Sequence, residues 1–341
     1  MKNKFSPYLI SILLVIAAVF LSLGIGTVKI PVKDLVQITL AKFGFVSTTD
    51  LNQTFATILI DLRLPRTILL ALTGAALAGS GASYQGLFRN PLADPYLIGV
   101  ASGAGMGAVI AMTIGWPVKI LGLLTVPMAA FLTAMMTVLA VYSLARVGKT
   151  VPTTNMLLAG VTISSFCTAL TSFLMIQSQN ELRRAIIWLL GGSALTGWLP
   201  VVAVLPYTLI GCGVLVFMGY PLNVLQFGED QAQQLGLPVN RIKTVIILAS
   251  SLSAAAAVAF SGIIGFVGLI VPHVVRLLWT SDYRKLIPLS LILGSFTLLV
   301  TDVIARIVIP PQEIPLGVIT ALVGAPFFLW VLRRSKQQAF W

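Results

Sequence analysis

The sequence predicts an all-α polytopic membrane protein with about ten transmembrane helices in each subunit, as three observations indicate. Charged residues make up 9% of the chain and apolar residues 57%, whereas soluble domains average about 25% and about 45–50%. The apolar residues form continuous runs of about twenty, the length at which a helix crosses the hydrocarbon core of a bilayer. The strands of a membrane barrel would instead alternate between apolar and polar residues. Residues 1–341 are therefore interpreted as one transmembrane domain.

The first apolar segment, from Tyr8 to Ile25, follows Lys2 and Lys4 and so resembles a secretory signal peptide. It is too long for the apolar region of a signal peptide, and no small-x-small cleavage site follows it. It is therefore taken as the first span. The spans predicted along the chain are residues 8–27, 57–84, 95–115, 118–144, 153–177, 199–219, 242–261, 263–279, 286–308 and 316–333.

The basic residues indicate how these spans are oriented. An even number of spans places both termini on one side of the membrane, and Lys and Arg are more frequent in the segments on that side. The basic tail, with Arg333, Arg334 and Lys336, adds to the excess. Because basic loops stay preferentially inside, both termini are predicted to be cytoplasmic. The net charge of +12 is spread singly between apolar runs, which is typical of contacts with lipid head groups and not of nucleic-acid binding.

Small residues recur at four-residue spacing within several spans. Gly74, Ala78, Ala82 and Gly86 form one such row in the second span. Rows of this kind let two helix backbones approach closely, and packing is what drives helix association inside a membrane. The sequence therefore predicts a tightly packed bundle around this span.

The chain shows no pattern typical of catalysis or metal binding. Cys167 and Cys212 both lie inside apolar runs, which argues against a disulfide framework or a metal site. The single histidine, His273, is more typical of a side chain satisfied by a backbone carbonyl than of a haem or metal ligand. The sequence contains no G-x-x-x-x-G-K-[ST] loop, so any ATP hydrolysis must belong to another chain. No acidic residue lies squarely in the middle of a predicted span, as a proton-coupled carrier usually requires.

The segment of residues 220–241 is unusually polar, and its local signals predict a short structured hairpin on the inner side. Glu229 and Asp230 would occupy the first turn of a helix, where the helix dipole favours acids. Gly236 suits the position after the helix C-terminus, and Pro238 prevents its continuation. Residues 221–225 could form another helical turn. Two interpretations remain open, a docking surface for a cytosolic partner and an ordinary connecting loop.

Three arginines lie at outer span ends. Arg63 and Arg66 begin the second predicted span, and Arg306 ends the ninth. From the residues alone they are interfacial side chains that reach toward water, and Arg306 is also spaced to pair with Asp302.

Blocks along most of the chain resemble one family, the permeases of bacterial ABC importers for iron-siderophores, haem and cobalamin. The resemblance covers nearly everything from about residue 55 to 335. It is carried by RLPR at 63–66, GAALAGSG at 74–81, QGLFRNPLADP at 85–95, LLAG at 157–160, WLLGGS at 188–193, the segment 228–238, GIIGFVGLIVPH at 262–273 and LGVITALVGAPFF at 316–328.

This resemblance implies a transport subunit, with no catalytic residues or cofactor of its own, in the bacterial cytoplasmic membrane. The family's assembly is a homodimer with two cytosolic ATPase subunits, which hold ATP and Mg, and one external substrate-binding protein. The expected cargo is an iron chelate (siderophore or haem), with cobalamin next. The alternatives are an ion-coupled secondary transporter, which would move cargo without an ATPase, and an intramembrane enzyme, which would need a buried catalytic set.

The resemblance also implies roles for particular residues. Two prolines stiffen the turn between the second and third spans, and the family places this turn at the inner mouth of the pathway. The implied roles are docking of the binding protein for Arg63, Arg66 and Arg306; coupling to the ATPase for Gly228, Glu229, Ala232, Leu235 and Gly236; and gating for Asn90, Leu92, Thr153 and Thr154.

Overall fold

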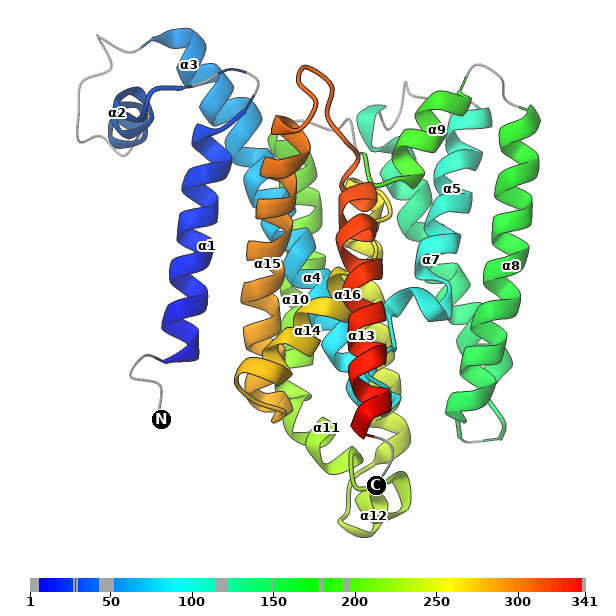
Figure 1. Cartoon of the computed structure of the whole chain (residues 1–341). Coiled ribbons are helices and arrows are strands. Elements are labelled where there is room, and N and C mark those ends of the chain that lie inside the picture. The colour runs from blue at the N-terminus through cyan, green and yellow to red at the C-terminus, as the bar shows by residue number, and fades with distance from the viewer. Residues whose placement is uncertain are drawn as a thin grey trace.

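A computed structural model describes residues 6–26, 28, 30–42, 52–114, 122–148, 150–177, 181–192 and 197–338. Within these ranges the regular secondary structure is all helical, apart from one isolated bridge between Val147 and Thr150. The helices run side by side as a bundle (Figure 1). The elements are α1 (Pro7–Gly24), α2 (Val32–Lys42), α3 (Gln53–Thr57), the π-helix η1 (Ile58–Arg63), α4 (Leu64–Leu87), η2 (Pro95–Ile98), α5 (Val100–Ile114), η3 (Gly122–Leu124), α7 (Thr125–Ala145), α8 (Thr153–Gln177), α9 (Leu182–Leu189), α10 (Trp198–Phe217), α11 (Gly219–Leu225), α12 (Glu229–Gln234), α13 (Val239–Ser261), α14 (Val267–Leu278), α15 (Tyr283–Ile307) and α16 (Leu316–Gln338).

Among the described residues, six helical segments are long and apolar enough to cross a membrane. They are α1, the run of η3 and α7, α8, α10, α13 and α15, and shorter apolar helices occur at residues 100–114, 267–278 and 316–331. The prediction of an all-helical membrane protein is thereby confirmed. All six lie within or close to segments that the sequence pattern marked as spans.

Helix α4 lies at the centre of the bundle and packs against α10, α13, α14 and α15. Its small residues explain this position. A Cβ atom at Gly74 would overlap the carbonyl of Gly294 in α15, and one at Gly294 would overlap the carbonyl of Gly74. A Cβ at Gly81 would likewise overlap the carbonyl of Gly268 in α14. The predicted close packing around the small-residue row is therefore confirmed.

Buried polar side chains fasten α4 to α13. The Ser80 hydroxyl donates to the carbonyl of Ser250 at 2.9 Å, and the Tyr84 hydroxyl lies 2.8 Å from the hydroxyl of Ser251. Each contact satisfies polar atoms that have no access to water, where an unmade hydrogen bond would cost about 1–3 kcal/mol. The α4–α13 pair therefore has a fixed register.

The structure also contains helices that the sequence pattern did not predict. The chain enters α4 through α3 and η1, so the helical run begins at Gln53, ahead of the predicted start at residue 57. Helices α2 and α9 were not predicted because they are too short or too polar to qualify as spans. In α2, Leu35 and Ile38 are buried in a small cluster with Leu23 and Leu59. Helices α2, α3 and α9 lie at one end of the bundle (Figure 1).

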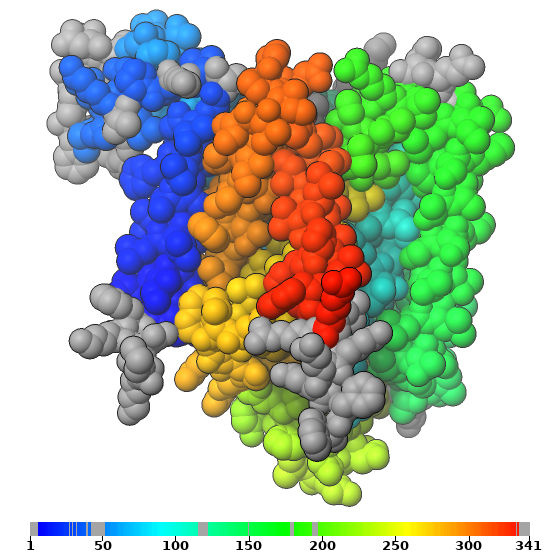
Figure 2. Space-filling model, viewed as in Figure 1, coloured from blue at the N-terminus to red at the C-terminus, as the bar shows by residue number. Residues whose placement is uncertain are grey.

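The opposite end of the bundle carries the short helices α11 and α12, together with the beginning of α1 and the end of α16 (Figure 1). We call the α11–α12 end the inner end and the α3–α9 end the outer end. The first and last described helices thus start and finish at the same end. The face shown in Figure 2 is formed by α1, α15, α16 and α8, in that order across the view.

Candidate functional sites at the two ends of the bundle

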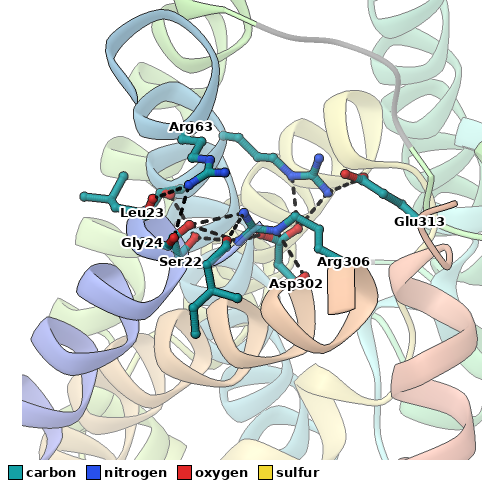
Figure 3. Close-up of polar contacts among 10 residues, drawn as sticks. Ser22, Leu23, Gly24, Arg63, Asp302, Arg306 and Glu313 are labelled. Carbon is teal, nitrogen blue, oxygen red and sulfur yellow. Dashed lines mark hydrogen bonds and ion pairs between the residues drawn. The ribbon is translucent and has the colours of Figure 1, made fainter. Parts of the chain in front are cut away.

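At the outer end, one buried carboxylate joins two arginines (Figure 3). Asp302, in α15, has no exposed area, and its oxygens lie 2.8 Å from Arg66 and 2.7 Å from Arg306. Arg66 also forms an ion pair with Glu313 at 2.8 Å. Because a buried charge is tolerated only when it is paired, Asp302 fixes where both guanidinium groups lie. We call Arg63, Arg66, Asp302, Arg306 and Glu313 the outer arginine cluster.

Two of these arginines cap the C-terminus of α1. The last carbonyls of a helix have no partner within the helix. Arg63 donates hydrogen bonds to the carbonyls of Leu23 at 2.7 Å and Gly24 at 3.3 Å. Arg306 donates to the carbonyl of Ser22 at 3.1 Å. Positive charge at this end also suits the helix dipole. The cluster therefore holds the peripheral helix α1 on α15.

The three arginines differ in how far they are available to a partner. Arg63 is 7% exposed and Arg306 5%, whereas the Arg66 side chain is 34% exposed. Arg66 is therefore the one of the three that the structure presents at the surface. The sequence reasoning noted the spacing of Asp302 and Arg306, but it did not identify Asp302 as the centre of the cluster, nor Glu313. Both pair with Arg66, which lies too far away along the chain for a local pattern to find.

At the inner end, the predicted short helix and its glycine stop are confirmed. Helix α12 begins with Glu229 and Asp230, as expected from the helix dipole. Gly228 and Gly236 flank the helix at φ +118° and +84°. The amide of Leu237 donates to the carbonyl of Ala232 at 3.1 Å, a bond typical of a helix that ends in a left-handed glycine. The hairpin is thus a formed structure and not an extended loop.

The two faces of this hairpin differ. Ala232 is fully buried and packs toward the bundle, whereas Leu235 is 70% exposed. Phe227, which the sequence reasoning did not single out, is exposed to the same extent. Single exposed apolar side chains are common on protein surfaces, so these two show only where the predicted docking face would offer apolar contact. Leu235 and Phe227 therefore mark the candidate docking face.

Side-chain hydrogen bonds attach the hairpin to the ends of α4 and α15. The Gln226 amide donates to the carbonyl of Gly86 at 2.9 Å, and the Asn223 amide donates to Asp282 at 2.6 Å. The pKa of the Asp282 carboxyl is held well below its usual range because Arg284 and Asn223 donate hydrogen bonds to it. Asp282 is therefore ionised at neutral pH, and this attachment keeps its charge.

The candidate gate residues lie in two separate places at the inner end. Asn90 and Leu92 are exposed in the turn after α4, where the side-chain oxygen of Asn90 accepts a hydrogen bond from the Leu92 amide at 2.9 Å. Thr153 and Thr154 begin α8, Thr153 half-buried and Thr154 exposed. The turn at Asn90 follows the end of α4, to which Gln226 of the hairpin is hydrogen-bonded.

The sequence matches the profile of a known protein family over most of its length. The profile of the FecCD transport family matches residues 13–334. The chain belongs to the FecCD transport family. The resemblance inferred from the sequence blocks is confirmed, and the chain is an ABC transporter permease. The buried outer cluster and the inner hairpin are therefore parts of a transport subunit.

Curated relatives of this permease cover most of its length. It is 39% identical to the ABC transporter permease protein YvrB of Bacillus subtilis over 98% of this chain and 96% of that protein. It is 44% identical to the cobalamin import system permease protein BtuC of Halobacterium salinarum, over 84% of this chain and 76% of that protein. It is 35% identical to the hemin transport system permease protein HmuU of Yersinia pestis, over 99% of both chains.

A solved structure shares the fold of this permease. It is described as an inward-facing conformation of an ABC transporter of the metal-chelate type. The two agree with a TM-score of 0.81 and 29% sequence identity, over 96% of this chain and 98% of that one. The arrangement of helices is therefore that of a known transporter.

Proposed function

We propose that this permease is the membrane subunit of an ATP-driven importer in the bacterial cytoplasmic membrane. It would cross the membrane about ten times, with both termini and the hairpin of residues 220–241 in the cytoplasm. The observation that carries the proposal is the hairpin: a formed helix outside the spans, with Leu235 and Phe227 exposed and side-chain bonds to α4 and α15. A segment built in this way can receive a cytosolic ATPase and pass its movement to the spans.

The assembly we propose is a homodimer with its cargo pathway between the two copies. Helix α8 supports this, since only 17% of the residues in its most apolar 18-residue stretch are buried within one chain. Its exposed surface mixes the apolar residues Phe166 and Phe173 with the hydroxyl-bearing residues Thr162, Ser165 and Ser172. The hydroxyls of Thr162 and Ser165 donate to carbonyls of α8 itself, so the support for a second copy comes from the extent of the exposed surface and not from unmet hydrogen bonds. Two cytosolic ATPase subunits, holding ATP and Mg, and one external binding protein would complete the transporter.

At the outer end we propose that Arg66 makes the first contact with the external binding protein. It is partly exposed and its geometry is fixed by two carboxylates, so an acidic partner group would meet a positioned charge. Such charge pairs set orientation and encounter rate more than affinity. The docking roles of Arg63 and Arg306 stay a prediction that requires their guanidinium groups to leave the α1 carbonyls.

The cargo we propose is a metal chelate of the size of haem, a ferric siderophore or cobalamin, as the relatives' names suggest. The deciding experiment measures uptake of ⁵⁵Fe-haem, a ⁵⁵Fe-siderophore and labelled cobalamin in a deletion strain with and without the restored gene. We expect uptake of one of the three to be lost and regained. Unchanged uptake of all three would contradict this cargo class. Uptake driven in liposomes by an ion gradient without any ATPase would favour a secondary transporter.

A further inference from the structure

A buried lysine at the inner end joins three separate elements. Lys243 lies in the second turn of α13 and is 4% exposed. Its ammonium group donates one hydrogen bond to a carboxylate oxygen of Glu229 at 2.8 Å and another to the backbone carbonyl of Val151 at 2.7 Å. None of the roles given above to the permease accounts for this residue.

The two partners of Lys243 belong to the two parts of the inner end that transport must connect. Glu229 is the first residue of α12, in the hairpin proposed to receive the ATPase. Val151 is buried in the loop between α7 and α8, directly before Pro152 and the first residues of α8. The proline ring fixes its own backbone angle. Because Pro152 has this fixed angle, a displacement of Val151 is expected to displace Thr153 as well.

The helices on either side of this contact differ in how much of them one chain buries. In α13, 78% of the most apolar 18-residue stretch is buried, against 17% in α8. Helix α8 therefore has fewer contacts within its own chain that would oppose a displacement. The ammonium is buried although the Glu229 side chain is 44% exposed, so losing either acceptor would leave the lysine charge poorly compensated. As long as both bonds persist, α12 and the beginning of α8 have to move together.

We propose that Lys243 is a positioning residue that transmits the movement of the coupling hairpin to α8. Through Glu229 it follows α12, and through Val151 it directs the residues that open the inner gate. This inference rests on the proposed function, since it assumes that an ATPase moves α12. A purely structural clamp would stabilise the fold equally well but would leave the movement of α8 independent of Lys243.

The test follows the two elements separately in the permease–ATPase complex in nanodiscs. Cys167 and Cys212 are replaced by alanine, and spin labels are placed either at Gln234→Cys, exposed on α12, or at Leu158→Cys, exposed on α8. Distances between the two copies are then compared without nucleotide and after trapping with ATP and vanadate. In the protein with Lys243 intact, both distances are expected to change.

Lys243→Met should keep the nucleotide-driven change at residue 234 and lose at least half of the change at residue 158. Lys243→Arg, whose guanidinium can still donate to two acceptors, should restore it. Lys285→Met removes an exposed positive charge from the same side and should change neither distance. If Lys243→Met fails to assemble, Glu229→Gln serves as the variant. It should keep the change at residue 234 and lose a smaller part of the change at residue 158.

The outcomes separate this inference from the proposed function. A full change at residue 158 in an assembled Lys243→Met complex, or in Glu229→Gln where it serves as the variant, overturns the role of Lys243 and leaves the importer assignment intact. No change at residue 234 in the protein with Lys243 intact overturns the proposed coupling itself, and the role of Lys243 falls with it. A loss at residue 158 that Lys243→Arg does not restore identifies a packing effect and also overturns the inference.

Discussion

At the residue scale, three arginines at the same end of the bundle have different tasks. Arg63 and Arg306 direct their guanidinium groups to carbonyls at the end of α1. Arg63 bonds Leu23, 40 positions away in the chain, and Arg306 bonds Ser22, 284 positions away. Arg66 instead extends to the surface between Asp302 and Glu313. The sequence predicted basic groups at the outer span ends. It could not predict that two of them are used internally, because their acceptors are remote backbone atoms.

The first prediction concerns Arg306 as a cap and counter-charge. Arg306→Met should lower the free energy of unfolding in mixed micelles by roughly 3–5 kcal/mol, because Asp302 loses a partner and α1 loses its cap. Glu313→Gln should cost about 1 kcal/mol or less, since both side chains of the Arg66–Glu313 pair are partly exposed and such an ion pair contributes little. Equal losses in the two variants would show that Arg306 has no special structural role.

A second residue-scale prediction concerns the glycine that ends α12. Gly236 adopts φ +84° with open space around it, so only backbone strain should oppose a larger residue. Gly236→Val should destabilise α12 locally by about 1–2 kcal/mol. Exchange of the α12 amide hydrogens should then be roughly 5–30 times faster. Gly236→Asn, which tolerates this conformation better, should show a smaller effect, and equal rates in both variants would argue against strain.

At the element scale, the inner hairpin shows what local signals can and cannot predict. Acids in the first turn, a glycine stop and a proline are all properties of neighbouring residues, so α12 was predicted from sequence. Its orientation was not, because that depends on the bond between Glu229 and Lys243 of α13 and on the preceding segment, which is bonded to α4 and α15. Ala232 therefore faces the bundle, and Leu235 and Phe227 face outward. An arginine at position 232 would displace the whole of α12 and would not act on the docking face alone.

The same distinction holds for the other helices. Long apolar runs predicted the spans because the bilayer imposes a length on each of them. Helices α2 and α9 were not predicted, because neither has an apolar run of the length that a bilayer requires. Helix α2 is stabilised by packing: its Leu35 and Ile38 contact the cluster that contains Leu23 and Leu59. The two-fold use of Asp302 and the link through Lys243 likewise depend on residues from several elements. Contacts of this kind require the fold before they can be found.

The element-scale prediction tests the docking face of the hairpin. Leu235→Asp should reduce co-purification of the ATPase by about tenfold, equivalent to about 1.4 kcal/mol of binding free energy, because it places a charge where apolar contact is expected. The bundle should stay folded, since Leu235 is exposed. Gln234→Asp adds the same charge to an already polar neighbour and serves as the control. Normal co-purification and ATP turnover in Leu235→Asp would show that the hairpin is only a connector.

At the scale of the whole molecule, the inner and outer ends differ in how extensively buried contacts join their helices. The outer arginine cluster has a buried centre at Asp302 and Arg306 and joins α1, α4 and α15, so it stiffens that end. Within one chain, 78% of the most apolar stretch of α13 is buried, against 17% for α8. In the proposed topology the inner end faces the cytoplasm. Movement of α8 relative to α13 would then open the proposed gate, while the outer arginine cluster holds α1, α4 and α15 together.

The last prediction tests whether the turn after α4 lies at a gate between two copies. Leu92 is 45% exposed at the inner end, next to the α4 terminus that the hairpin holds through Gln226. With Cys167 and Cys212 replaced by alanine, Leu92→Cys should form a disulfide-linked dimer in at least one nucleotide state, because closure would bring the two turns together across the dimer axis. Leu139→Cys, exposed on α7, should not crosslink in any state. Crosslinking is measured on non-reducing gels without nucleotide, with ATP, and with ATP and vanadate. If Leu92→Cys stays monomeric under all three conditions while the ATPase remains bound, the turn lies away from the axis and the gate must be sought at Thr153 and Thr154.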